Sequence, residues 1–181
     1  AGAAILDVNV GHPGVDEVRV LPAIVRQLQS VCDLPLQLDT TKPRAMEAAL
    51  RIYNGKAIIN SVNGKESSMK DILPLARKYG ASVIALPLDD EGIPETAEGR
   101  LEIIGKIITR ADELGIPRQD ISLDARTMTI SAQGDSALVT LKCMDLVREK
   151  YGLLTTLGIS NISFGAPNRP ALNLAFLTLA L

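Results

Sequence analysis

The chain alternates between short apolar runs and longer stretches in which apolar residues recur every three to four positions. Six runs have the length of buried β-strands, at residues 3–8, 34–38, 56–59, 82–86, 121–123 and 155–158. The stretches that follow them have helical periodicity, at residues 16–31, 43–53, 69–79, 96–114, 136–151 and 171–179. Such alternation is typical of βα units, so the sequence predicts an α/β fold with a parallel sheet.

Local residue choices indicate where several helices begin and end. Asp16 is suited to opening the first helix, Pro43 suits the first turn of the second, and Gly80 follows the third. The positions expected to face the core are Val18, Leu21, Ile24, Val25, Leu28 and Val31 in the first helix, and Leu138, Leu141, Met144, Leu146 and Val147 in the fifth.

The βα pattern favours one domain over residues 1–181 with the architecture of a TIM (β/α)8 barrel. A complete barrel of this kind takes ~250 residues, whereas this chain has 181. It starts at Ala1 without an initiator Met, and its last residues, 176–181, are apolar apart from Thr178. We therefore expect about six βα units here, with the first and last units of the barrel absent.

Composition narrows the classes of partner. The chain is 46% apolar and 22% charged, its net charge is −2, and it has no dense basic run, so we expect neither nucleic acid nor a membrane surface as a partner. Cys32 and Cys143 are interpreted as free thiols in a reducing compartment, which favours the cytoplasm. With His12 as the single histidine, no metal site is predicted.

Polar side chains gather at the carboxyl ends of the predicted strands, the edge at which α/β barrels build their active sites. They are carboxylates and carboxamides: Asp7, Asn9, Asp39, Asn60, Asp89, Asp90, Asp124 and Asn161. A carboxylate can accept two hydrogen bonds from an exocyclic amine and a neighbouring ring N–H, and an asparagine supplies one acceptor and one donor. This set predicts a site for a flat heterocycle, and it does not favour phosphoryl transfer or Schiff-base chemistry.

Most of these residues also have a purely structural interpretation. Asp39 could cap the helix that follows it, and Asp124 could accept hydrogen bonds from loop amides. Asn60 and Asn161 could occupy turns with positive φ. Structural or loop roles are also open for the remaining polar residues, namely Asp7, Asn9, His12, the acidic run 89–91 and the segment 131–134.

Six segments together resemble a known family. They are LDVNVG at 6–11, LPLQLDT at 34–40, GKAIINSVNG at 55–64, GASVIALPLDDEGIP at 80–94, ISLD at 121–124 and LGISNISFGAPNR at 157–169, the last being the most specific. They resemble the pterin-binding family, in particular methyltetrahydrofolate:corrinoid methyltransferases and the folate domain of cobalamin-dependent methionine synthase.

The resemblance implies a TIM barrel and a set of roles. Asn161 is implied to reach the reacting nitrogen, and is the catalytic candidate. The implied substrate-binding residues are Asp39, Asn60 and Asp124 on the pterin ring, Asp7 and Asn9 shaping the pocket, and Gly158, Ser160 and Arg169 in the last segment. The implied reaction moves the N5-methyl group of methyltetrahydrofolate to a reduced cobalt corrinoid (cobalamin) that another domain or protein carries. Family members often pair through the barrel's helices, so a homodimer is a further expectation.

Methyl transfer gives Asn161 a chemical task. The carbon–nitrogen bond that breaks would leave an amide-like anion, which is a very poor leaving group. The nitrogen must therefore gain a proton, or at least a hydrogen bond, as the methyl group departs. A carboxamide N–H can stabilise that charge more strongly in the transition state than in the ground state, and such a difference is what accelerates a reaction.

Two alternatives stay open at this point. The first is dihydropteroate synthase, a family that is similar in fold and in much of the pocket. Its second strand usually ends in a Gly-Gly-Glu-Ser-Thr-like segment, and its seventh-strand loop carries a lysine. This chain has Asn-Val-Gly at 9–11 and Pro-Asn-Arg at 167–169, which counts against that reaction. The other alternative is a non-catalytic pterin-binding fragment.

Overall fold

The computed structural model describes residues 2–181, and Ala1 lies outside them. Six parallel strands form one sheet in the order β1-β2-β3-β4-β5-β6. The strands are β1 (Leu6–Asn9), β2 (Leu36–Asp39), β3 (Ile58–Asn63), β4 (Ser82–Leu86), β5 (Ile121–Asp124) and β6 (Leu154–Thr156). Because strand order follows sequence order, each strand pairs with the next one along the chain, as repeated βα units require.

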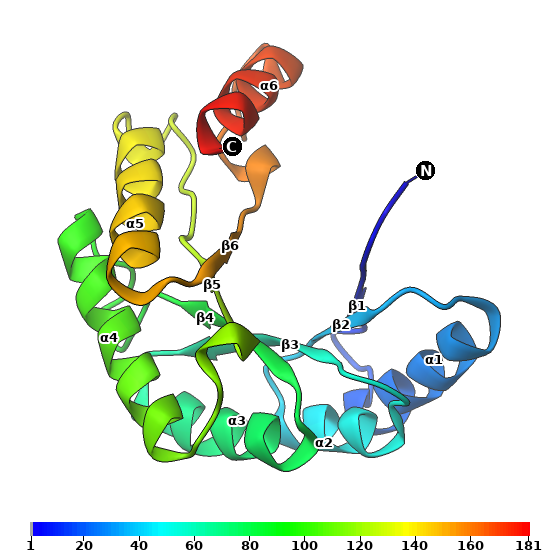
Figure 1. Cartoon of the computed structure of the whole chain (residues 1–181). Coiled ribbons are helices and arrows are strands. Elements are labelled where there is room, and N and C mark those ends of the chain that lie inside the picture. The colour runs from blue at the N-terminus through cyan, green and yellow to red at the C-terminus, as the bar shows by residue number, and fades with distance from the viewer. Residues whose placement is uncertain (1) are drawn as a thin grey trace.

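Helices alternate with the strands, and the first five lie on one side of the sheet (Figure 1). They are α1 (Glu17–Val31), α2 (Pro43–Ile52), α3 (Glu66–Tyr79), α4 (Ala97–Glu113), α5 (Ser136–Tyr151) and α6 (Arg169–Ala180), with short 3-10 helices η1 (Arg118–Asp120) and η2 (Ile159–Asn161). Figure 1 shows the sheet curving so that α1 to α5 follow its outer side, while α6 stands beyond β6. The predicted α/β fold is thereby confirmed as a half-barrel of six βα units.

The apolar core lies between the sheet and the outer helices. Fully buried side chains come from strands and helices alike, among them Leu36, Leu38, Ile59, Leu123, Met46, Leu73, Ile104 and Ile107. Local signals position the helices as predicted: Asp16 accepts a hydrogen bond from the Val18 amide at the start of α1, and Gly80 ends α3 in the left-handed region at φ 63°.

Three positions predicted to face the core are exposed. Val18 and Val31 of α1, the helix that follows the edge strand β1, are 40% and 81% exposed. Leu138 of α5 is 70% exposed. The buried positions of α5 include Ser136 and Thr140, so the helix turns a partly polar face inward. The periodicity predicted the position of this helix correctly, but not which of its faces packs against the core.

Two strands differ from prediction in ways that affect the site. β3 continues to Asn63, so Asn60 lies inside a strand and not at its end. The last strand, predicted as a buried run at 155–158, is β6 at Leu154–Thr156, and Leu154 is 75% exposed. Among the described residues β6 pairs only with β5, so one of its edges has no strand neighbour. Asn161 therefore follows the strand by five residues and lies in η2.

No helix within residues 2–181 has both the length and the apolar character needed to cross a membrane.

Candidate functional site

Strand register places most of the predicted site residues on one face of the sheet. Asn9 pairs with Asp39, and Asp39 pairs with Asn60. Asn60 pairs with Ile84, and Ile84 pairs with Ser122. Residues paired across a parallel sheet point to the same side, so these positions form one row. Asp124 lies two residues beyond Ser122 on β5, and Asp7 lies two residues before Asn9 on β1, so both belong to the same face.

That face is the one away from the outer helices. On β2, Leu36 and Leu38 are fully buried, whereas Gln37 and Asp39 are half-buried. Side chains alternate between the two faces of a strand, so the leucines face the helices and Asp39 faces the inside of the half-barrel. In Figure 1 the sheet curves towards this inner side, with β1 and β6 at its two ends.

Asn9 and Asp39 are in direct contact. Asn9 Nδ2 donates a hydrogen bond of 2.8 Å to Asp39 Oδ2, and Asn9 Oδ1 accepts one of 2.7 Å from the Gly11 amide. Two residues earlier on each strand, Gln37 Nε2 donates to Asp7 Oδ1 at 2.5 Å. Asp7 and Asn9 thus have the structural contacts that the sequence left open, and Asn9 in addition holds the Asp39 carboxylate.

Asp39 is not a helix cap. The residue before α2 is Lys42, which makes no side-chain capping bond, so the structural alternative for Asp39 is wrong. Burial raises the pKa of the Asp39 carboxyl above its ordinary value, the bond from Asn9 lowers it, and the neighbouring Asp7 and Glu17 charges raise it. Only one oxygen of the Asp39 carboxylate is hydrogen-bonded to Asn9, and the side chain is only partly buried. The carboxylate can therefore still accept hydrogen bonds from a ligand.

A cleft of about 390 Å³, lined mainly by polar residues, opens beside this row. It runs from the ends of β2 and β3 towards the start of α3, and its walls include Asp39, Thr40, Asn60, Ser61, Asn63 and Ser68. Asp39 and Asn60 therefore share one cleft, as their adjacent strand positions require. Asp124 and Asn161 are not among the residues lining it.

A buried carboxylate that the sequence did not single out lies behind Asp39. Glu17, in the first turn of α1, accepts a hydrogen bond from Thr40 Oγ1 at 2.5 Å and pairs with Lys42 Nζ at 2.9 Å. These partners, Thr40 first, lower the pKa of the Glu17 carboxyl. Glu17 looks in sequence like an ordinary acidic residue at a helix start, so no local signal distinguished it.

Asp124 accepts a hydrogen bond from a loop amide, as its structural interpretation predicted. Its Oδ1 accepts a hydrogen bond of 2.8 Å from the Arg126 amide, within the loop after β5. Burial raises the pKa of the Asp124 carboxyl, and this bond together with the Arg126 charge lowers it. One carboxylate oxygen is thus engaged locally, and the residue still lies on the inner face.

The segment 157–169 forms a loop fixed by its own contacts. Arg169, at the start of α6, donates from Nε to Ser163 Oγ and from Nη2 to the Ser160 carbonyl, both at 3.2 Å. Its guanidinium also lies 5.9 Å from the centre of the Phe164 ring. Across the loop, Thr129 Oγ1 donates to the Phe164 carbonyl at 2.6 Å, which ties this segment to the loop after β5.

Asn161 presents an exposed side chain in this loop. Neither Asn161 nor Asn60 has a positive φ: among non-glycine residues of the described chain only Arg126 does, at 57°. The positive φ that the structural alternative assumed is therefore absent at both asparagines, although Asn161 does lie in the short 3-10 turn η2. A Cβ on Gly158 would lie 2.8 Å from Asn161 Nδ2, so the glycine leaves room for the Asn161 side chain.

The other polar groups noted in the sequence lie in loops. Asp89 accepts a hydrogen bond from the Glu91 amide, and His12 Nδ1 lies 2.9 Å from the Pro13 carbonyl. Within residues 2–181 no three His, Cys, Asp or Glu side chains are grouped as metal ligands.

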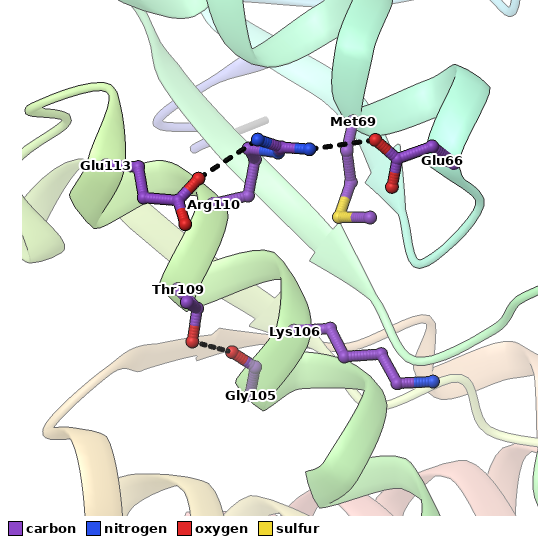
Figure 2. Close-up of a pocket in the computed structure, with 7 residues that line it drawn as sticks. All are labelled: Glu66, Met69, Gly105, Lys106, Thr109, Arg110 and Glu113. Carbon is purple, nitrogen blue, oxygen red and sulfur yellow. Dashed lines mark hydrogen bonds and ion pairs between the residues drawn. The ribbon is translucent and has the colours of Figure 1, made fainter.

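A second, wider hollow of about 530 Å³ lies on the outer side between α3 and α4. Figure 2 shows Arg110 reaching towards Glu66 and Glu113, with ion pairs of 2.8 and 3.0 Å. None of the predicted site residues lines it. A guanidinium already paired with two carboxylates has little left to offer a ligand, so the inner face is the better candidate.

Known proteins are similar to this chain in sequence. Methionine synthase of Mycobacterium leprae is 34% identical over 189 residues, covering 97% of this chain but 16% of that protein. Methylcorrinoid:tetrahydrofolate methyltransferase of Eubacterium limosum is 29% identical over 184 residues, covering 100% of this chain and 68% of that protein. The chain thus spans about one-sixth of the methionine synthase.

Solved structures share the fold at lower identity. A dihydropteroate synthase from Vibrio fischeri superimposes with a TM-score of 0.70 at 17% identity, over 99% of this chain and 73% of that chain. The DHPS of Yersinia pestis gives 0.73 at 16% identity with the same coverage. At this identity the likeness shows the fold alone. The family model described as pterin binding enzyme matches residues 1–181, and the chain therefore belongs to the pterin-binding enzyme family.

Proposed function

We propose that this chain binds methyltetrahydrofolate by its pterin ring and moves the N5-methyl group to a reduced cobalt corrinoid held by another domain or protein. The observation that carries the proposal is the row of Asn9, Asp39 and Asn60 on the inner face, with Asp39 held by Asn9 and lining a cleft together with Asn60. A half-buried carboxylate between two carboxamides matches a ring edge with adjacent donors and an acceptor.

The ring would be positioned by several groups acting together. Asp39 and Asp124 offer acceptors for the exocyclic amine and ring N–H groups, and Asn60 offers both a donor and an acceptor. Each bond to a charged group contributes about 1.5–3 kcal/mol. Their main effect on rate is to hold the reacting nitrogen in a productive geometry.

Asn161 would act on the charge that develops as the methyl group leaves. Its side chain is exposed and belongs to a loop that Arg169 and Thr129 hold in place, so the carboxamide is available to a ligand. A donor fixed in advance costs little reorganisation during the reaction, which is why such groups stabilise transition states. Gly158, Ser160 and Arg169 would serve by shaping this loop.

Methyl transfer is favoured over dihydropteroate synthesis by the sequence relatives. The two relatives at 29–34% identity are named for methionine synthesis and for methyl transfer between a corrinoid and tetrahydrofolate. The second name gives the methylcorrinoid as donor, which is the reverse direction, and one site can serve both directions of a reversible transfer. The segments at 9–11 and 167–169 add to the case against a dihydropteroate synthase.

The corrinoid would be a substrate supplied from outside residues 1–181. The chain has one histidine, His12, in an exposed loop, and the similar methionine synthase is about six times longer. A partner domain or protein would approach the open inner side. A homodimer stays a prediction, which sedimentation of the purified protein would check.

The test combines binding with turnover. Calorimetry with methyltetrahydrofolate should give saturable binding, and addition of cob(I)alamin should give methylcobalamin, followed by visible absorbance. Formation of dihydropteroate from that enzyme's two substrates would favour the second candidate, and binding without transfer would favour a non-catalytic module. Absence of methyltetrahydrofolate binding would overturn the proposal.

A further inference from the structure

Arg100 is the most deeply buried charged residue in the half-barrel. It lies in the first turns of α4 and has 0% of its surface exposed. On α4 it falls on the same stripe as Ile104 and Ile107, where the periodicity alone would call for an apolar side chain. Burying a charge is costly unless hydrogen bonds compensate for the lost water.

The partners of Arg100 are backbone carbonyls of two loops at the same end of the sheet. Its Nε donates to the Pro94 carbonyl at 2.9 Å, in the loop before α4. Its Nη1 donates to the Ala125 carbonyl at 2.9 Å and to the Arg126 carbonyl at 3.3 Å, and lies 3.4 Å from Thr140 Oγ1. One guanidinium thus joins the loop after β4 to the loop after β5.

The loop after β5 needs such support. Arg126 has a φ of 57°, a region that residues with a Cβ rarely adopt and that costs free energy unless the surroundings impose it. In this conformation the Arg126 amide donates to Asp124 Oδ1 at 2.8 Å. The same residue therefore gives its amide to Asp124 and its carbonyl to Arg100.

We infer that Arg100 is a positioning residue for Asp124: it holds the carbonyls of Ala125 and Arg126 so that the Arg126 amide fixes the Asp124 carboxylate on the inner face. The inference rests on the proposed function only for the consequence that Asp124 meets a pterin. Lysine would keep the charge but not the planar fork that reaches several carbonyls at once. Arg100→Lys is therefore the informative change. Its control is Arg110→Lys on the same helix, where the guanidinium pairs with Glu66 and Glu113 on the outer side.

The first test needs no ligand. Hydrogen exchange of backbone amides, measured by NMR, should show the Arg126 amide losing protection by roughly ten-fold or more in Arg100→Lys, the size of one hydrogen bond lost. Amides of β2 and β3 should keep their protection, and Arg110→Lys should change neither group. Wild-type protection at Arg126 in Arg100→Lys overturns the inference. Unfolding of both Arg100→Lys and Arg100→Gln overturns it too, because Arg100 would then serve the fold at large.

The second test asks whether the effect passes through Asp124. Arg100→Lys should raise the Kd for methyltetrahydrofolate about ten-fold in the wild-type background and less than about two-fold in an Asp124→Asn background, because coupled residues are not additive. Equal losses in both backgrounds overturn the inference. If the wild-type protein binds no methyltetrahydrofolate, the proposed function fails, while the exchange experiment still decides the role of Arg100.

Discussion

Asn9 and Asp39, thirty residues apart in the chain, are joined by a hydrogen bond of 2.8 Å from the Asn9 amide to the Asp39 carboxylate. The bond crosses from β1 to β2, where the two residues are direct register partners. It orients a half-buried carboxylate towards the inner side of the half-barrel, next to Asn60 on β3. Pterin binding and methyl transfer should therefore depend on this arrangement and on the loop that carries Asn161.

Removal of the Asp39 carboxylate should abolish most pterin binding. Asp39→Ala should raise the Kd for methyltetrahydrofolate by roughly 100-fold or more, since up to two charge-assisted bonds are lost. Burial raises the pKa of this carboxyl, so wild-type affinity should fall on acidification at a higher pH than an exposed aspartate would give. Calorimetry between pH 7 and pH 4 measures both effects. Asp33→Ala, in an exposed loop, is the control, and unchanged affinity in Asp39→Ala removes it from the site.

Loss of the Asn161 carboxamide should slow the reaction more than it weakens binding. Asn161→Ala should lower the rate of methyl transfer by about 100-fold, as loss of one transition-state donor does, and change the Kd by less than about three-fold. Stopped-flow absorbance of the corrinoid gives the rate, and calorimetry gives the Kd. Asn168→Ala, in the same exposed segment, should leave both near wild type. Parallel losses of rate and affinity would refute the transition-state role.

A methyl group at position 158 should displace Asn161 without harming the fold. The new Cβ in Gly158→Ala would lie 2.8 Å from Asn161 Nδ2, the end of a flexible side chain that can swing away. The backbone φ of −76° at this position suits alanine. We expect a melting temperature near wild type and a transfer rate lowered by roughly ten-fold. Gly134→Ala, where open space surrounds the site, is the matched control. A wild-type rate in Gly158→Ala would show that the rotamer of Asn161 does not matter.

Neutralisation of Asp124 should stabilise the protein at neutral pH. Burial raises the folded-state pKa of this carboxyl above its unfolded value. Its contribution to stability is therefore complete below the unfolded pKa and is lost as pH rises through the folded pKa. Asp124→Asn keeps the acceptor for the Arg126 amide and removes the charge. It should raise the free energy of unfolding at pH 7 by about 1 kcal/mol at most, with the difference vanishing near pH 3.

Urea unfolding at the two pH values measures this difference. Asp145→Asn, on the exposed side of α5, should show no such gain. A loss of stability at pH 7 in Asp124→Asn would mean that the negative charge, not only the acceptor, holds the loop.

Glu17 should show the opposite pH dependence. Hydrogen bonds from Thr40 and Lys42 lower its folded pKa, so its contribution to stability is present above the unfolded pKa and is lost as pH falls through the folded pKa. Glu17→Gln should lower the melting temperature by several degrees at pH 7, and the gap should close on acidification. Thermal unfolding followed by circular dichroism provides the measurement, with Glu102→Gln, at an exposed position of α4, as control. A constant gap from pH 7 to pH 3 would show that the ionised form is not what matters.

Much of this architecture could be read from residue order. Runs such as 82–86 and 121–123 predicted strands within a residue of the observed ones, since short apolar segments between polar turns have few other ways to bury themselves. Caps such as Asp16 and Gly80 gave helix ends because their chemistry is local. Alternation of strands and helices gave the parallel sheet, and hence the edge at which Asp39 and Asn60 meet.

Other features depend on contacts that sequence distance conceals. The helical period does not state which face of α5 packs inward, so Leu138 was assigned to the core although it is exposed. Only packing against α4 selects Thr140, which lies beside Arg100. Arg100 is a charged residue in an otherwise apolar stripe of α4. This mismatch was the one local indication of its role.

The sequence by itself determined the succession of βα units and the residue types available at their carboxyl ends, because periodicity and capping act within a few positions. Tertiary structure alone decided that Asn9 donates to Asp39 and that Glu17 is buried behind Thr40. It also decided that Arg100 donates to a carbonyl of the loop after Asp124. Those pairings arise from strand register and helix packing. They join residues more than twenty positions apart, where no local rule fixes which side chains will meet.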